Sequence, residues 1–173
     1  MALYRCIGGN KFYANVGAIQ SFTSSFTDVC QKGDLYVLIL NGNNPTITGA
    51  DVLETWDTYS ASFPAKILKA TGTSISVSGV TNGVYARIIN TPQIKYETIN
   101  ITANVNIDIT SKKDDLVIFP YIASSETFSL IANLQKSFDA NAGNQRMAIF
   151  RLTSDGVATF KDSHAYKLIR IYK

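Results

Sequence analysis

The chain has 173 residues, 46% of them apolar, which is enough to bury a core without metals or disulfides. Its formal net charge of +3 is small and its basic residues are scattered, which argues against nucleic acid as a partner. No apolar run is long enough to cross a bilayer, and the first residues do not form a secretory signal. We therefore expect a protein made in the cytoplasm, with no membrane segment.

The first expected element is an N-terminal arm over residues 1–13. It contains Leu3, Tyr4 and Ile7, apolar side chains that a free tail would leave in water, and Gly8-Gly9, which can act as a joint. We expect the arm to bind a partner protein through Leu3, Tyr4 and Ile7. An extra edge strand on the chain's own first sheet is the alternative.

The first half of the chain contains patterns typical of strands. Residues 35–40 are continuously apolar, which predicts a strand buried on both faces. Residues 49–60 fit either a helix or a strand, and we prefer the strand. Ile75 and Val77 predict a further strand, and Asn82-Gly83 predicts a tight hairpin turn after it.

The second half has the same character. Apolar residues alternate over 99–109, which predicts one strand with an apolar face. Pro120 lies within an apolar run and predicts an edge strand or a bulge. Residues 126–139 again fit helix or strand, with the β-rich surroundings favouring strand. Asp155-Gly156 predicts a second tight hairpin.

Three segments of the first half recur in the same order in the second half. "KGDLYVLIL" from Lys32 matches "KDDLVIFPY" from Lys113, and "YARII" matches "LIRIY" near the end of each half. Between them, "TWDTYSASFPAKILKATGTS" lies over "SFDANAGNQRMAIFRLTSDG" without a gap, which places Trp56 over Phe138. We interpret residues 14–90 and 94–173 as two copies of one unit, joined by the short segment 91–93.

The spacing of the strands indicates the fold class. Short strands at intervals of roughly eight to twelve residues, separated by Gly, Asn and Pro turns, are typical of β-sandwiches. Charged residues make up only 17% of the chain, so Ser, Thr and Asn must cover much of its surface, as in many β-proteins. We expect an all-β fold of two tandem, related β-sandwich units packed together, of the jelly-roll or Ig-like Greek-key type. Leu38, Ile67 and Ile149 are expected in its core.

The chain does not have the pattern of an active site. His164 is the single histidine and lies in a segment typical of an exposed turn. Asp114 and Asp115 are adjacent and would point to opposite faces of a strand, so they would not act together. Asp115 matches Asp34 across the two copies, and both are expected to cap the turn before a buried strand.

The remaining polar groups give no ligand set either. Cys6 and Cys30 are the only cysteines, too few for a zinc site, and are expected to be free thiols. No Asp-rich loop could supply the oxygens that calcium requires, and no Gly-rich loop could hold a phosphate. We therefore expect no enzymatic activity, no catalytic residue, no metal and no cofactor.

Trp56 and Tyr59 form the one candidate ligand site. If they are exposed, the two rings could stack on a sugar. The alignment of Trp56 with Phe138 favours a shared core position instead.

A resemblance to phage proteins rests on two parts of the sequence. The opening "MALYRCIGG" is similar to the Met-Ala-Leu-Tyr-Lys-Cys-Gly-Gly starts of small tail and accessory virion proteins of phages of Gram-positive bacteria. Arg5 stands in place of the usual Lys, and Ile7 interrupts the Cys-Gly step. "GDLYVLIL", "ITGADVLET", "KILKATGTSISVSG" and "YARI" resemble β-sandwich modules of phage fibres and decoration proteins, over most of the first copy.

The resemblance implies a non-enzymatic structural protein exposed on the virion and assembled in the host cytoplasm. Capsid decoration, head fibre and tail accessory are the types it includes, and it transfers no functional residues. The expected partners are other virion proteins, capsid or tail, with the protein itself homo-oligomeric on the particle. The alternative is a receptor-binding module that recognises a glycan of the host surface through Trp56 and Tyr59.

Overall fold

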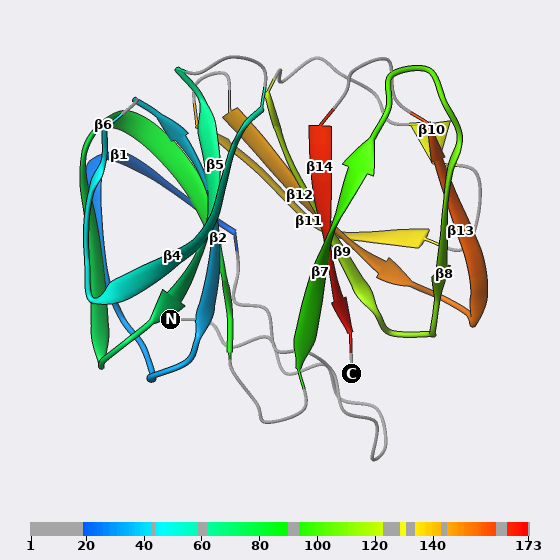
Figure 1. The fold of residues 1–173 in the computed structure, drawn as a ribbon, viewed down its shortest axis with the longest axis horizontal. Coiled ribbons are helices and arrows are strands. Elements are labelled where there is room, and N and C mark those ends of the chain that lie inside the picture. Colours follow the sequence, from blue (N-terminus) through cyan, green and yellow to red (C-terminus); the bar gives the residue numbers. More distant parts are fainter. Residues whose placement is uncertain are drawn as a thin grey trace.

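The computed structural model describes residues 19–42, 44–58, 62–89, 94–122, 129–130, 134–142, 145–161 and 166–172 (Figure 1). Within these ranges the regular structure is entirely β, and no helix is long and apolar enough to cross a membrane. The strands are β1 Gln20–Val29, β2 Leu35–Asn41, β3 Thr46–Thr48, β4 Ala50–Asp57, β5 Pro64–Ala70, β6 Ser74–Ile88, β7 Lys95–Ile101, β8 Ile107–Ser111, β9 Leu116–Ile122, β10 Ser129–Leu130, β11 Leu134–Ala142, β12 Gln145–Leu152, β13 Gly156–Lys161 and β14 Tyr166–Tyr172.

These strands form three antiparallel sheets. The six-stranded sheet, on the left in Figure 1, has the order β1-β6-β2-β5-β4, and β3 pairs with the first part of β6. The five-stranded sheet in the middle has the order β11-β12-β9-β14-β7. The three-stranded sheet on the right has the order β10-β13-β8.

The two large sheets have the same strand order when both are followed along the chain. β1, β2, β4, β5 and β6 hold the places that β7, β9, β11, β12 and β14 hold in the second sheet. Val37 pairs with Ile67 and Ala86, and Ile118 pairs with Ile149 and Ile169. Each of these residues lies at the same place in its matching sequence segment, so the pairing of the strands repeats together with the sequence.

The smaller strands follow the same scheme. In the first half, β3 and the second part of β1 flank the first part of β6, with Phe26 opposite Val77. In the second half, β10 and β8 flank β13, with Ile107 opposite Phe160. β1 bends at Ser24, which has a φ of 59° and lies where the pairing with β6 shifts.

The central core lies between the two large sheets. β2 is fully buried from Leu35 to Leu40, and the alternate residues Leu35, Val37 and Ile39 face the second sheet. Ile67 of β5 and Ile149 of β12 belong to the same core. A strand covered on both faces has no polar side, which explains the uninterrupted apolar run in the sequence.

An outer core lies on the far side of each large sheet. Tyr36 and Leu38 of β2 pack with Ile75 and Val77 of β6 beneath the covering strands of the first half. In the second half, Phe119 of β9 packs in a core that β8 and β13 cover. The molecule therefore has three apolar layers, and each large sheet contributes to two of them.

Several expectations are confirmed. Leu38, Ile67 and Ile149 are buried, with at most 1% of each residue exposed. The segment 49–60 contains strand β4, and the described parts of 126–139 belong to strands β10 and β11. The strand expected at Ile75 and Val77 is also present, as the first part of β6.

The predicted hairpin at Asn82-Gly83 is wrong, because β6 continues through both residues from Ser74 to Ile88. Gly83 pairs with Phe22 on one side and Leu40 on the other. A Cβ atom on Gly83 would lie 2.5 Å from the Phe22 ring. The glycine is needed for the close approach of a neighbouring side chain and not for a turn.

The expected hairpin at Asp155-Gly156 is also wrong in its pairing. The chain does turn there, and Gly156 has a φ of 131°. However, β12 ends in the five-stranded sheet and β13 begins in the three-stranded sheet, so the two strands are not paired. The turn carries the chain from one layer to the next.

The expected single strand over 99–109 is two strands, β7 and β8. Asn104 adopts a φ of 61° in the turn between them, a left-handed conformation that Asn tolerates better than most residues. Val105 is 47% exposed, whereas Ile101 and Ile109 face the same outer core. The alternating pattern thus identified two inward faces but not the bend between them.

Pro120 does not lie in an edge strand, because β9 is interior, between β12 and β14. Its pairing with β12 is continuous, with Pro120 opposite Met147 and no bulge. The pairing of β9 with β14 ends at Ile118, before the proline. An interior strand tolerates the missing N–H at this place because the neighbouring ladder has already ended.

The gapless alignment of Trp56 with Phe138 is wrong, because the two residues do not hold the same place in the paired strands. Trp56 pairs with Ala65, and Ala65 corresponds to Met147, whose partner is Ala140 and not Phe138. The connections after the two strands explain this shift. Asp57 is the last residue of β4 to pair, with Pro64, whereas β11 continues to Ala142, which pairs with Gln145. The second connection is therefore the shorter one.

We expect Ile67→Ala to lower the free energy of unfolding by about 2–5 kcal/mol, because it leaves a cavity in the central core. Urea denaturation measures the change. Lys69→Ala is the matched control, since Lys69 is an exposed residue of the same strand and its truncation should cost little. An unchanged unfolding midpoint for Ile67→Ala would mean that the side chain faces away from the core.

Candidate functional site

Most of the residues expected to bind a partner lie outside the described ranges. Leu3, Tyr4 and Ile7 of the arm belong to this group, and Tyr59 of the candidate sugar site also lies outside the described ranges. His164 and Cys6, for which no binding role is expected, lie outside them as well. Trp56 is described, and it lies in the central core with 8% of the residue exposed. The Nζ atom of Lys167 is 5.6 Å from the centroid of its ring. A platform for a sugar requires an open ring face, which this position does not offer.

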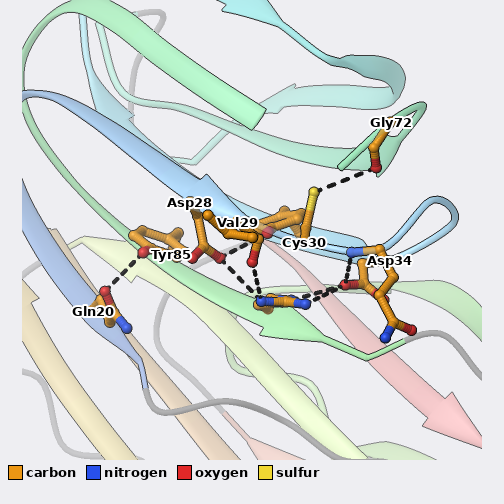
Figure 2. Close-up of polar contacts among 10 residues, drawn as sticks. Gln20, Asp28, Val29, Cys30, Asp34, Gly72 and Tyr85 are labelled. Carbon is orange, nitrogen blue, oxygen red and sulfur yellow. Dashed lines mark hydrogen bonds and ion pairs between the residues drawn. The ribbon is translucent and has the colours of Figure 1, made fainter. Parts of the chain in front are cut away.

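The most polar arrangement in the first half is a cluster of Asp28, Asp34 and Arg87, which we call the first carboxylate–arginine cluster (Figure 2). Asp34 is fully buried and immediately precedes β2. Its Oδ2 accepts a hydrogen bond of 2.9 Å from Nε of Arg87 and lies 2.6 Å from Nη2. The same oxygen accepts a hydrogen bond of 2.9 Å from the backbone N–H of Gln31.

The rest of the guanidinium is held by β1. Nη1 of Arg87 donates to the carbonyl oxygen of Val29 at 2.6 Å and lies 3.6 Å from Oδ2 of Asp28. Asp28 in turn accepts a hydrogen bond of 2.7 Å from the hydroxyl of Tyr36. Burial opposes the charge of Arg87, but the hydrogen bond with Asp34 and the nearby acids outweigh it and raise the pKa of the guanidinium.

A second carboxylate–arginine cluster, of Glu97, Asp115 and Arg170, has the same plan. Oδ2 of Asp115 accepts hydrogen bonds from Nε and Nη2 of Arg170 at 3.0 and 2.7 Å. It also accepts a hydrogen bond of 3.0 Å from the backbone N–H of Lys112. Nη1 of Arg170 donates to Oε1 of Glu97 at 2.8 Å. Asp115 and Arg170 hold the places in the matching sequence segments that Asp34 and Arg87 hold in the first half.

The backbone around both carboxylates is also the same. The N–H of Ala70 donates to the carbonyl of Asp34, and the N–H of Gly33 donates to the carbonyl of Ala70, both at 2.8 Å. Asp115 and its preceding residue make the equivalent pair with Leu152, both at 2.9 Å. Gly33 and Asp114 both have positive φ, 94° and 76°, as the third residue of each turn. The expectation that Asp34 and Asp115 cap these turns is therefore confirmed.

The sequence did not reveal the arginine partners. Arg87 and Arg170 lie in the matching segments "YARII" and "LIRIY", and this match is the sequence feature from which they could have been found. Each is far from its carboxylate along the chain, so only the sheet pairing brings the two charges together. A matched Asp and a matched Arg in two copies of a unit would have justified the prediction of an ion pair in each.

The contacts of the two clusters hold the turns against the sheets. Each carboxylate is engaged by a guanidinium and by a backbone N–H, and arginine does not give up its proton near neutral pH. Cys30 beside the first cluster is a buried free thiol, and burial raises its pKa, which makes it a weak nucleophile. In the described part of the chain, no group of three or more His, Cys, Asp or Glu residues could hold a metal ion.

Comparison with known proteins adds no relative: no family model, no curated protein and no solved structure matches this chain.

Stability is expected to fall at alkaline pH through Tyr85. Burial, together with the charge of Asp28, raises the pKa of the Tyr85 hydroxyl to about 12. This value exceeds the ordinary value of 10.0, so the folded state holds the proton of Tyr85 more tightly than the unfolded state does. The resulting contribution to the free energy of unfolding is complete below pH 10 and is lost as the pH rises through about 12. Tyr85→Phe should therefore lose less stability than the wild type across this window. Parallel slopes in urea titrations at successive pH values would contradict this assignment.

Proposed function

We propose that the chain is a non-enzymatic structural component of a phage particle, exposed on the virion as a decoration, head-fibre or tail-accessory protein. The observation that supports this best is that the buried charged side chains bind one another and the backbone of nearby turns. Asp34 with Arg87, and Asp115 with Arg170, tie turns to sheets, so these groups serve rigidity. A rigid all-β block with three apolar layers suits a particle component, and the sequence resemblance points to the same class.

We also infer that the fold consists of two tandem, related units, residues 14–90 and 94–173. The equal strand order, the equivalent places of the paired residues and the two matching clusters support this inference. The jelly-roll or Ig-like Greek-key type expected from the sequence stays a prediction.

We assign docking onto other virion proteins to residues 1–11. Several copies of the protein are expected on each particle. Deletion of residues 2–9 tests the assignment. The expected result is an unchanged melting temperature and loss of the protein from purified particles, because the segment precedes both repeated units of the sequence. Quantitative mass spectrometry of particles measures incorporation, and Lys161→Ala, a substitution of an exposed residue, is the control.

Two other results would contradict the proposal. A lower melting temperature with normal incorporation would mean that the segment is a strand of the protein's own fold. Normal incorporation with weaker attachment of particles to host cells would instead favour the receptor-binding alternative, in which the protein recognises a host glycan.

A further inference from the structure

Two side-chain amides at the central core have buried atoms without a hydrogen-bond partner. Gln145, the first residue of β12, has no exposed surface, and neither its Oε1 nor its Nε2 has a partner in the described part of the chain. Oδ1 of Asn82 on β6 is likewise buried and unpartnered among these residues. Burial of an amide without hydrogen bonds is unfavourable, so both groups point to a further polar partner.

Both amides face the space between the two large sheets. Met147 and Ile149 of β12 belong to the central core, and Gln145 shares their face because alternate residues of a strand point to the same side. Val84 belongs to the same core and lies two residues after Asn82, in a regularly paired part of β6. β12 lies against β6 and β2. The amides therefore approach one interface from opposite sheets.

The rows of paired residues in the two sheets lie over each other in the same order. Glu54 of β4 accepts a hydrogen bond of 3.4 Å from Thr98 of β7. Trp56 comes two residues later on β4, and the centroid of its ring lies 5.6 Å from Nζ of Lys167 of β14. Lys167 stands one row beyond Thr98 in the second sheet, just as Trp56 stands one row beyond Glu54 in the first. Neighbouring rows of one sheet thus meet neighbouring rows of the other.

This correspondence places the two amides at the same end of the interface. Strand pairing carries the row of Trp56 across the first sheet to Val84, and the row of Lys167 lies level with Met147 in the second. Asn82 and Gln145 each come one row further in the same direction, on strands that lie against each other.

We propose that ordered water binds between Asn82 and Gln145 and joins the two halves of the molecule through them. The unpartnered atoms are two acceptors, Oδ1 of Asn82 and Oε1 of Gln145, and one donor, Nε2 of Gln145. Water can donate to the first two and accept from the third, and a buried water molecule typically makes about three hydrogen bonds. Neither amide carries a charge that would favour an ion. The site does not depend on the function proposed for the protein.

The test measures bound water through nuclear Overhauser effects between water and the side-chain amide protons of the full-length, ¹⁵N-labelled protein. Water held in the site tumbles with the protein, so its laboratory-frame and rotating-frame effects have opposite signs. Water on the surface exchanges too fast to give this pattern, and the side-chain amide of Asn100, exposed on β7, provides that reference. Asn82→Ala removes one partner of the water, and Asn100→Ala is the matched control.

The wild type and Asn100→Ala are expected to show effects of opposite sign at the side-chain amide of Gln145, and Asn82→Ala is expected to lose most of their intensity. If the wild type shows no such effects at Gln145, no long-lived water is bound there and the proposal is wrong. If Asn82→Ala leaves them at full intensity, the water does not join the two halves, which also contradicts the proposal.

Discussion

Asp34→Ala is expected to lower the free energy of unfolding by about 3–5 kcal/mol, the range found when one partner of a buried ion pair is removed. Asp34 has no exposed surface, and its loss leaves the guanidinium of Arg87, 18% exposed, without its closest counter-charge. The backbone N–H of Gln31 loses its acceptor as well. The turn before β2 would keep its backbone hydrogen bonds to Ala70 and the bond of 3.0 Å from the N–H of residue 34 to the carbonyl of Gln31.

Asp115→Ala is expected to have a similar effect, because the second cluster repeats the same contacts. Asp108→Ala is the matched control. Asp108 accepts a hydrogen bond of 2.7 Å from Thr159, but the contact is exposed, so its loss should cost at most about 1 kcal/mol. Urea denaturation of the three variants gives the comparison.

The double variant Asp34→Ala/Arg87→Met separates the two origins of the loss. If most of the loss comes from an unpaired buried charge, replacing the arginine as well should recover part of the stability. A loss below about 1 kcal/mol for Asp34→Ala alone would show that Asp28 and the carbonyl of Val29 are sufficient to hold the guanidinium.

The elements that could be predicted from the sequence are those whose cause is local. The apolar run at residues 35–40 indicated a strand buried on both faces, because each residue of such a strand must be apolar regardless of its neighbours. Asp34 and Asp115 were recognised as turn acids, since an Asp that caps a turn bonds to a backbone group close by in the chain. Repetition of both features in the two halves then indicated a common strand order.

Local sequence patterns mislead where residues distant in the chain decide the structure. Asn82-Gly83 has the composition of a hairpin turn, but the glycine is required by Phe22 of β1, which is distant in the sequence. Pro120 has the composition of an edge residue, but the place at which the pairing of β9 with β14 ends determines which backbone groups need partners. The Asp–Arg pairs were missed for the same reason. Neither residue indicates its partner until the sheets are assembled.

Trp56→Ala is expected to lower the free energy of unfolding by about 3–5 kcal/mol. The ring fills the central core near the edge of the first sheet, among side chains of both halves. Truncation would leave a cavity at the interface and remove the ring beside Lys167. Trp56→Phe should cost clearly less, because Nε1 of Trp56 has no hydrogen-bond partner among the described residues and a smaller ring still fills part of the space.

Val52→Ala provides the matched control on the same strand. Val52 is 48% exposed on β4, so its truncation should change the free energy of unfolding by no more than about 0.5 kcal/mol. Urea denaturation of the three variants tests the core position, and a particle attachment assay on the same samples tests sugar binding. If Trp56→Ala unfolded at the wild-type midpoint but weakened attachment to host cells, the ring would have to serve a ligand and not the core. If Trp56→Ala and Trp56→Phe were equally destabilising, the stabilisation would come from the part of the indole that a phenyl ring lacks, and the explanation by filled core volume would be wrong.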